Sequence, residues 1–307
     1  MSEQKETVLL TGGLGQVGYY SYLQLKEKYQ ICILDNMINS KVNPPIDVIF
    51  IKGDIRNQEI YSLLPKVEII IHCAAQISIA KSTINPILDA ETNIFGTLNL
   101  LEFARKKDVD RFVFISSAAT YGNPQFVPIT EEHPRKPLSP YGMSKLVAEQ
   151  YVSLYSNLYG LNSINIVPFN IYSPLQKEDD PYAGVIFKFL KAIKNNQSPM
   201  IEGDGYQTRD FVHIKDVTTA IDLALKNKHI TNRTINIGSG EPTTILELAR
   251  ILVQISGKKL ELVHEEPREA DIRESFTSLK LAKELLNYSP QIKLKDGLKD
   301  MYDSLLV

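Results

Sequence analysis

The residues most suited to chemistry are a tyrosine and a lysine four positions apart, Tyr141 and Lys145. Residues i and i+4 share one face of a helix, so the lysine ammonium is expected beside the phenol. A nearby cation favours the phenolate and lowers the pKa of the tyrosine. A phenolate can act as general base on an alcohol or sugar hydroxyl. The same spacing also occurs in ordinary surface pairs on helices, so the pair needs further support.

A serine at the end of a predicted strand gives that support. Ser116 and Ser117 close the apolar segment 111–117, upstream of the helix predicted at 140–159. In a doubly wound sheet the carboxyl ends of the strands face the ligand crevice, so Ser117 would present its hydroxyl there. Taken alone, Ser117 could equally be a cap at a strand end. Together, the three residues predict a catalytic group of Ser117, Tyr141 and Lys145.

A glycine-rich segment follows the first predicted strand, 7–10, and precedes a predicted helix, 17–28. Glycines in such a loop allow a tight turn and a close approach of the backbone to a pyrophosphate. The N-terminus of the helix then offers unpaired N–H groups to the phosphates. A tight strand–helix turn without a ligand is the alternative interpretation. The residues expected to contact a dinucleotide here are Gly12, Gly15, Gln16, Val17 and Gly18.

Acidic residues end the second and third predicted strands. Asp35, followed by Asn36, ends the strand 30–35, where a carboxylate can accept hydrogen bonds from the ribose hydroxyls of adenosine. A carboxylate at this position repels the 2′-phosphate of NADP, so NAD is the expected cofactor. Asp54 and Ile55 follow the strand predicted at 47–51 and are expected beside the adenine.

The elements that must position these residues alternate along the chain. Further strands are predicted at 66–73 and 163–169, and a long helix at 86–107. Strands that are apolar throughout are typical of parallel sheets covered on both faces. The sequence therefore predicts an α/β fold with a doubly wound, Rossmann-type parallel sheet at 1–170, to which later segments return. A smaller mixed α/β substrate-binding lobe is predicted at 171–307, with a loop at 173–181 and helices near 184–194, 215–227 and 244–256.

Composition excludes several other classes of protein. The chain has 307 residues and a formal net charge of -2, which gives no electrostatic reason to expect nucleic acid or an acidic membrane as partner. The N-terminal segment lacks the pattern of a signal peptide, and no apolar run is long enough to span a membrane, so a cytoplasmic protein is expected. Two cysteines, Cys32 and Cys73, cannot form a zinc site, and no metal is expected.

These motifs, in this order, resemble the extended short-chain dehydrogenases/reductases, in particular the nucleotide-sugar 4-epimerases typified by UDP-glucose 4-epimerase. The resemblance covers nearly the whole chain. It includes T-G-G-x-G-x-x-G at 11–18, L-D-N at 34–36, G-D-I-R at 53–56, H-C-A-A at 72–75 and N-I-x-G-T at 93–97. It continues with S-S-A-A-T-Y-G at 116–122, S-P-Y-G-M-S-K at 139–145, F-N-I-Y at 169–172, R-D-F-V-H at 209–213 and R-E-A-D-I-R-E-S at 268–275.

The resemblance implies roles for individual residues. Ala74, Ala75 and Asn93 would lie near NAD, together with the loop and strand-end residues named above. Asn170, Arg209 and Arg268 would hold the diphosphate of a UDP-hexose, which suits the paired hydrogen bonds that a guanidinium makes. Each arginine could instead pair with a neighbouring acid such as Asp210 or Glu241. The implied reaction is 4-epimerisation through a transient 4-keto sugar, in which NAD takes and returns a hydride.

Departures from the family pattern narrow the choice of reaction and of substrate. Gln16 and Val17 replace an aromatic residue and an isoleucine in the glycine loop. Dehydratases of the family carry an acid pair where this chain has Ala118 and Ala119, so dehydration is disfavoured. Ser275 matches a gate of the sugar pocket, and a small residue there leaves room for a 2-acetamido group. We therefore expect activity on UDP-N-acetylhexosamines as well as UDP-hexoses.

Two alternatives stay open at this level. One is another NAD-dependent nucleotide-sugar enzyme of the same family, such as a decarboxylase, reductase or dehydratase. The other is a protein that binds NAD without turnover, although such proteins typically lose the Tyr–Lys pair. By analogy with the family, the helices at 86–107 and 140–159 would pair with their symmetry mates in a homodimer.

Overall fold

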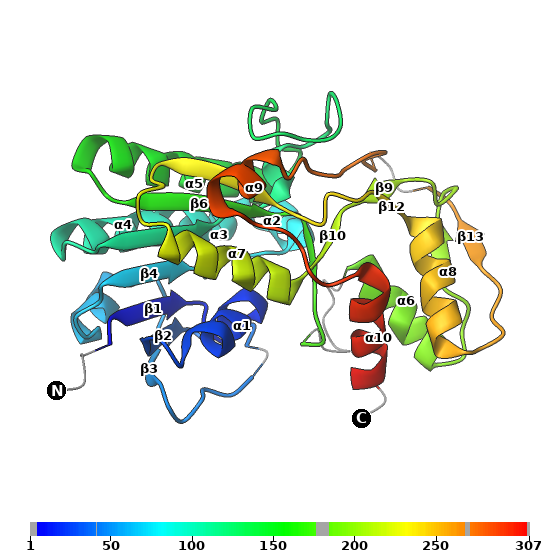
Figure 1. The fold of residues 1–307 in the computed structure, drawn as a ribbon, viewed down its shortest axis with the longest axis horizontal. Coiled ribbons are helices and arrows are strands. Elements are labelled where there is room, and N and C mark those ends of the chain that lie inside the picture. The colour runs from blue at the N-terminus through cyan, green and yellow to red at the C-terminus, as the bar shows by residue number, and fades with distance from the viewer. Residues whose placement is uncertain (1–4, 41, 176–183, 268–270, 306–307) are drawn as a thin grey trace.

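The computed structural model describes residues 5–40, 42–175, 184–267 and 271–305 of the chain. Seven parallel strands form the main sheet, in the order β11-β6-β5-β4-β1-β2-β3 (Figure 1). Their bounds are β1 Thr7–Thr11, β2 Gln30–Asp35, β3 Ile49–Lys52, β4 Ile69–His72, β5 Arg111–Ile115, β6 Ser163–Pro168 and β11 Arg233–Ile237. The chain winds outward from β1 to β3 on one side and from β4 onward on the other. The predicted doubly wound sheet is thus confirmed.

Two apolar cores lie on the two faces of this sheet. In β1, Val8 and Leu10 pack into one core, and Leu9 packs into the other, because successive side chains of a strand point to opposite faces. The first face is covered by α1 (Gln16–Leu25), α7 (Ile214–Lys226) and α9 (Lys280–Leu286). The second is covered by α4 (Gly96–Lys106) and α5 (Pro140–Tyr159). Burial on both faces explains why the strand sequences are apolar throughout.

A smaller lobe lies beyond the carboxyl ends of the strands (Figure 1). Its core packs together α6 (Val185–Lys194), α8 (Ile245–Ser256) and α10 (Leu294–Ser304). Three short strand pairs accompany them. These are β7 (Asn170–Tyr172) with β10 (Phe211–His213), β9 (Thr208–Arg209) with β12 (Thr243–Thr244), and β8 (Met200–Glu202) with β13 (Val263–Glu265). The mixed α/β lobe matches the predicted fold class, whereas the boundary at residue 170 stays a prediction.

The helix predicted at 86–107 is interrupted, which corrects the sequence-based expectation. It consists of α3 (Pro86–Ala90), a π-helical turn η2 (Glu91–Phe95) and α4. In a regular α-helix, residues four apart drift around the axis by about 40° per step. The wider π turn offsets this drift and keeps Asp89, Asn93 and Thr97 all buried. Such turns are frequent at functional sites.

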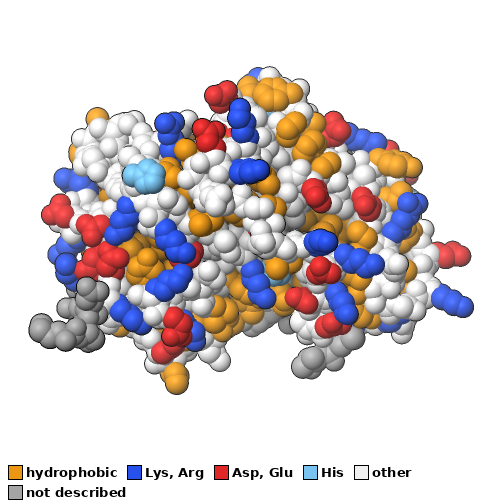
Figure 2. Space-filling model, viewed as in Figure 1, with side chains coloured by type: hydrophobic (Ala, Val, Ile, Leu, Met, Phe, Trp, Pro, Cys, Tyr) orange, Lys and Arg blue, Asp and Glu red, His pale blue; other side chains and the backbone are white. Residues whose placement is uncertain are grey.

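Smaller differences concern the ends of elements. Helix α1 ends at Leu25, earlier than predicted, while α5 spans the predicted 140–159. Five helical segments in the described residues were not predicted: η1 (Gln58–Leu63), α2 (Ile79–Ile84), η3 (Ala118–Thr120), α9 and α10. The loop predicted at 173–181 lies mostly outside the described residues. Within the described ranges, no helix is long and apolar enough to cross a membrane, and basic and acidic side chains alternate over the face in Figure 2.

Candidate active site

The site lies where the winding of the sheet reverses, between β1 and β4. In open α/β sheets this is the position of the ligand crevice. Gly12 follows β1 with a positive φ of 65°, and a Cβ there would meet the backbone of Ala74 at 2.7 Å. A Cβ on Gly18 would clash with the carbonyl oxygen of Gly12. Only glycine fits both positions, so the loop presents bare backbone at the switch point, as the predicted phosphate loop requires.

Asp35 ties the glycine loop to the end of β2. Its carboxylate is buried and accepts hydrogen bonds from the backbone N–H groups of Leu14, at 2.9 Å, and Met37, at 2.7 Å. The acid is therefore part of the wall of the loop. In the same loop, the side-chain amide nitrogen of Gln16 is buried and has no hydrogen-bond partner among the described residues. Gln16 thus leaves a donor available in the cradle.

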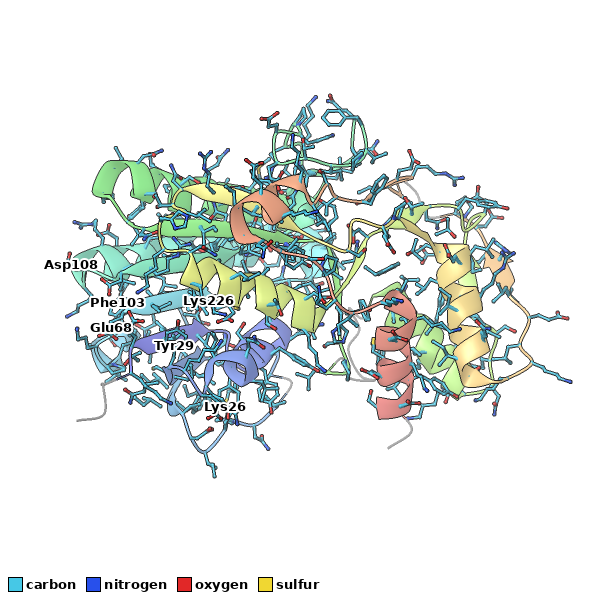
Figure 3. The ribbon with its side chains drawn as sticks, viewed as in Figure 1. Lys26, Tyr29, Glu68, Phe103, Asp108 and Lys226 are labelled. Atoms are coloured by element: carbon cyan, nitrogen blue, oxygen red, sulfur yellow. The ribbon has the colours of Figure 1, made fainter. Side chains whose placement is uncertain are left out.

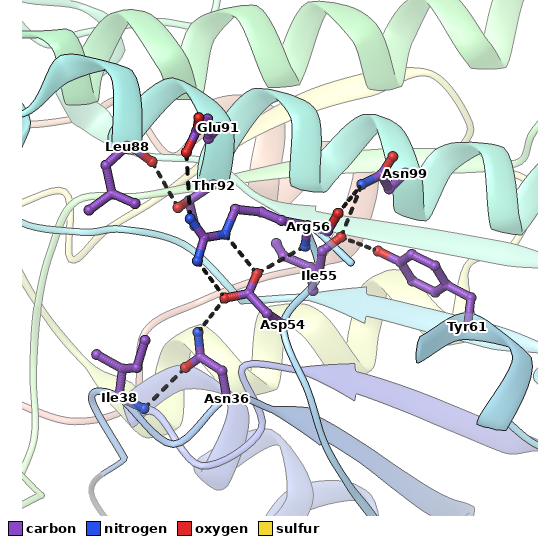
Figure 4. Close-up of polar contacts among 10 residues, drawn as sticks. All are labelled: Asn36, Ile38, Asp54, Ile55, Arg56, Tyr61, Leu88, Glu91, Thr92 and Asn99. Carbon is purple, nitrogen blue, oxygen red and sulfur yellow. Dashed lines mark hydrogen bonds and ion pairs between the residues drawn. The ribbon is translucent and has the colours of Figure 1, made fainter. Parts of the chain in front are cut away.

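A dense polar cluster surrounds Asp54 at the end of β3 (Figure 4). Its carboxylate accepts hydrogen bonds from the Arg56 backbone and side chain, each at 2.9 Å, and from Asn36 Nδ2 at 3.0 Å. These bonds, led by that from the Arg56 side chain, lower the pKa of Asp54 to about 2. Arg56 also reaches Glu91 of η2 at 3.6 Å. The cluster holds Ile55 in place beside the π turn.

The structure brings Ser117 and Tyr141 together. Ser117 caps the short helix η3 (Ala118–Thr120), and Ser139 caps α5 by accepting a hydrogen bond from Gly142 N at 3.1 Å. This cap, with Pro140 at the first helical position, fixes where α5 begins. The side chains of Ser117 and Tyr141 share a hydrogen bond. Burial raises the pKa of Tyr141, and the bond with Ser117 lowers it.

Lys145 lies one turn after Tyr141 and is buried. Its Nζ donates to the carbonyl oxygen of Ile115 at 2.5 Å and lies 4.1 Å from the ring centre of Phe114. Burial lowers the pKa of Lys145 to about 8. The expected lowering of the Tyr141 pKa by Lys145 is corrected by the structure, because burial dominates and Ser117 is the group that lowers it.

Asn93 connects three segments around the catalytic helix. Its side chain bonds the backbone N–H and carbonyl of Gln76, at 2.8 and 2.9 Å, and Ser144 Oγ at 3.0 Å. Ser144 in turn donates to the carbonyl oxygen of Tyr141 at 3.0 Å. Asn93 therefore links the loop after β4, which contains Ala74 and Ala75, to the first turn of α5.

Three of the predicted substrate residues, Asn170, Arg209 and Ser275, lie in the second lobe or at its edge. Asn170 Nδ2 donates to the backbone oxygen of Asp210 at 3.0 Å. Arg209 pairs with Asp271 at 2.5 Å. The Asp210 carboxylate instead accepts hydrogen bonds from a turn around Ser239, so it does not pair with the neighbouring arginine. Ser275 is half-buried next to β9, and Arg268 lies outside the described residues.

Sequence reasoning missed two buried groups that frame the site. Glu149 lies four residues after Lys145 and accepts a hydrogen bond from Ser116 Oγ at 2.5 Å. His72 bridges Thr11 and Thr97, at 2.7 and 3.0 Å. The spacing 141, 145, 149 on one helix face was a usable signal for Glu149, whereas His72 sits in an apolar run that indicates only a buried strand.

Comparisons with known proteins agree with this geometry. The family model described as GDP-mannose 4,6 dehydratase matches residues 9–301. A Methanocaldococcus jannaschii protein provisionally named UDP-glucose 4-epimerase is 41% identical over 301 residues, 95% of this chain and 96% of that protein.

Two solved structures are similar over almost the whole chain. The Thermotoga maritima UDP-glucose 4-epimerase with UDP-glucose has a TM-score of 0.92 at 34% identity and 98% coverage of both chains. The Methanobrevibacter ruminantium UDP-N-acetylglucosamine 4-epimerase in complex with UDP-N-acetylmuramic acid has a TM-score of 0.93 at 29% identity and 99% coverage of both. This chain therefore belongs to the GDP-mannose 4,6-dehydratase-like family of extended short-chain dehydrogenases/reductases, among relatives that are nucleotide-sugar epimerases.

Proposed function

We propose that this protein is an NAD-dependent nucleotide-sugar 4-epimerase that acts on UDP-hexoses. The observation that carries the proposal is the grouping of Ser117, Tyr141 and Lys145 at the carboxyl end of β5, next to the glycine loop at the switch point. Relatives named as UDP-sugar 4-epimerases support it.

The residues at the switch point fit NAD. The loop of Gly12, Gly15 and Gly18 is packed too closely against backbone for side chains at Gly12 and Gly18, so it presents bare backbone, and the unpartnered amide of Gln16 would supply a donor for a phosphate oxygen. Backbone N–H groups at Val17 would join them. The adenosine would be held by Asp35, Asn36, Asp54 and Ile55, and the nicotinamide half by Ala74, Ala75, Asn93, Tyr141 and Lys145. When bound, NAD would supply the hydride acceptor and donor for carbon 4.

The chain itself handles the proton. Tyr141 would take the proton of the 4-hydroxyl as its phenolate, which the hydrogen bond with Ser117 favours and burial opposes. Ser117 would orient the sugar hydroxyl and share the developing charge. Lys145 would support the phenolate and a ribose of the cofactor once its ammonium turns from the Ile115 carbonyl.

Anion-binding residues of the second lobe would hold the substrate. Asn170, Arg209 and Arg268 would bind the diphosphate. Arg209 is already oriented by Asp271 and by the backbone oxygen of Ile272 at 2.6 Å. Epimerisation is favoured over dehydration because Ala118 and Ala119 occupy η3, so no carboxylic acid follows Ser117.

Ser275 would set the size of the sugar pocket. Its small side chain would leave space for a 2-acetamido group, so UDP-N-acetylhexosamines are proposed as additional substrates. Replacing Ser275 with Tyr should lower activity on N-acetylated sugars while sparing plain hexoses. An unchanged ratio of the two activities would refute this role.

A homodimer is also proposed. Apolar side chains remain exposed on α3, η2 and α5, among them Leu88, Phe95, Leu154 and Leu158. The packing of α3 and α4 against α5 would let two copies form a four-helix bundle. Sedimentation of the protein and of a Leu154→Asp variant tests this, because a dimer built on this face should dissociate in the variant.

The central experiment follows the sugar by proton NMR without added cofactor. Purified protein is incubated with UDP-glucose and, separately, with UDP-N-acetylglucosamine. Appearance of the galacto epimer supports an epimerase that retains its NAD, and the faster substrate tests the Ser275 argument. Silence with both substrates, in protein shown to contain NAD, would overturn the proposed function.

A further inference from the structure

Asp89 is a buried aspartate that no sequence motif marked. It is 1% exposed on α3, one turn before Asn93. One carboxylate oxygen accepts hydrogen bonds from Gln76 Nε2 at 2.8 Å and from Asn93 Nδ2 at 3.2 Å. The other oxygen is buried and has no partner among the described residues. A buried, half-satisfied carboxylate is costly, so its presence calls for an explanation beyond packing.

Hydrogen bonds connect Asp89 to the catalytic helix. Asn93, which it holds, bonds Ser144 Oγ at 3.0 Å, and Ser144 donates to the carbonyl oxygen of Tyr141 at 3.0 Å. Gln76 is fixed from both sides, by Asp89 through its side chain and by Asn93 through its backbone. The backbone of Tyr141 is thus connected by hydrogen bonds to a network that ends at Asp89.

We infer that Asp89 is a positioning residue of the active site, which fixes the first turn of α5 through Asn93 and Ser144 and places a negative charge behind the Tyr141–Lys145 pair. The inference rests on the proposed function for its kinetic test. It adds a residue to the site, since Asp89 does not contact the reacting atoms.

The charge of Asp89 acts on both catalytic groups. It raises the pKa of Lys145, as do Cys73 and Glu149, against the larger lowering by burial. It also raises the pKa of Tyr141. The charged residues of the adjoining α2 and η2, Lys81 and Glu91, are exposed, and His72 is buried with its pKa lowered to about 3. Asp89 therefore favours the ammonium and opposes the phenolate, so removing its charge should lower both pKa values.

Asp89→Asn tests the charge with little change of shape. The active form needs Tyr141 deprotonated and Lys145 protonated, so the pKa values of these two groups set the two limbs of the kcat–pH profile. Both limbs should move to lower pH. The ratio of kcat one pH unit below the wild-type optimum to kcat one unit above it should rise roughly threefold. A variant that loses activity equally at every pH, with both limbs in place, would show a merely structural role and overturn the inference.

Asp108→Asn is the matched control. Asp108 is exposed at the end of the sheet opposite the second lobe (Figure 3), and its positive φ of 50° suits asparagine. The same change of charge should leave both limbs where they are. A shift in this control equal to that in Asp89→Asn would assign the effect to net charge and overturn the inference.

Ser144→Ala tests the hydrogen-bonded path separately. It removes the link between Asn93 and the Tyr141 turn but leaves every charge in place. We expect kcat to fall several-fold without movement of either limb. Full retention of kcat would refute positioning through Ser144, even if Asp89→Asn did not fold.

A titration independent of turnover separates this inference from the proposed function. Tyrosinate absorbance of the protein minus that of Tyr141→Phe reports ionisation of Tyr141, and Asp89→Asn should shift it to lower pH. A shift in protein that epimerises no sugar would refute the function and leave the inference standing. Active protein without the shift would refute the inference and leave the proposed function standing.

Discussion

The two ends of the cofactor crevice treat their charged groups in opposite ways. At the adenine end, Asp54 is surrounded by four donor contacts, and its pKa falls to about 2. At the catalytic end, burial dominates: it lowers the pKa of Lys145 to about 8 and raises that of Tyr141. One end fixes a permanent charge, whereas the other holds a lysine whose protonation can change near neutral pH and a tyrosine whose phenolate burial opposes.

This difference in protonation behaviour fits the function proposed for each end of the crevice. A binding site for adenosine gains from a charge that never titrates, because its hydrogen bonds then persist across physiological pH. General base catalysis needs a group whose two protonation states are both accessible. Desolvation by the sheet and by α5 provides this at Lys145, at a cost in stability, whereas at Tyr141 burial raises the pKa and the bond with Ser117 lowers it.

Tyr141→Phe should have the largest effect, because it removes the proposed base. We expect kcat to fall by roughly 10²–10⁴-fold, the usual contribution of a general base, with NAD content and thermal stability nearly unchanged. Epimerisation followed by NMR measures the loss. Tyr29→Phe, in a tyrosine at the far end of the sheet (Figure 3), is the control and should keep wild-type kcat. An active Tyr141→Phe enzyme would exclude this residue as base.

Lys145→Met should lower activity and raise stability. The pKa of Lys145 in the folded chain, about 8, lies below the value of 10.5 for an exposed lysine. At neutral pH the buried ammonium therefore lowers the free energy of unfolding by about 3 kcal/mol. Losing the bond to Ile115 offsets about 1 kcal/mol of this. Stability of the wild type should accordingly rise between pH 8 and 10.5, and that rise should be absent in the variant.

Denaturant unfolding across this pH range tests the sign. Lys66→Met, in a side chain that is 89% exposed, serves as control and should change stability by less than about 0.5 kcal/mol. If Lys145→Met destabilised the protein at every pH, the contrast between the two ends of the crevice would fail.

Asp54→Asn, at the adenine end, should lower the stability of the fold, whereas Lys145→Met should raise it. Here a lowered pKa stabilises the fold above the ordinary value of 3.8, and the benefit is lost as pH falls toward about 2. The variant should lose about 2 kcal/mol at neutral pH and release NAD more readily, with kcat at saturating cofactor preserved. Unfolding titrations and NAD content after dialysis measure the two effects. Equal stability of the two proteins at neutral pH would count against a structural role for the Asp54–Arg56 pair.

Much of the fold could be predicted from the sequence, because the residues that determine each element lie close together in the chain. Apolar strands, the glycine loop and the capped start of α5 each follow from residues close together in the chain. The π turn at 91–95 was not accessible, since it depends on Asn93 reaching Gln76 and Ser144. The pairing of β11 with β6 likewise joins segments far apart in sequence, for which periodicity gives no register.

The candidate site divides in the same way. Residue types and spacing placed Ser117 beside Tyr141, as found. They could not give the sign of the pKa shift of Tyr141, because desolvation depends on the packed surroundings rather than on the lysine one turn away. They also could not show that Arg209 pairs with Asp271 and not with Asp210, since the turn around Ser239 takes the nearer acid.

The smallest predicted effects come from removing two helix-capping residues, one at each end of the cofactor crevice. Ser139→Ala removes the cap of α5. Asn57→Ala removes the cap of η1, because the Asn57 side chain accepts a hydrogen bond from Glu59 N at 3.0 Å. Each loss should cost about 1 kcal/mol of unfolding free energy. Only the first helix carries Tyr141 and Lys145, so only Ser139→Ala should also lower kcat, by a few-fold, at saturating substrate and NAD. Equal kcat in the two variants would mean that the catalytic turn is held by Asn93 and Ser144 rather than by its cap.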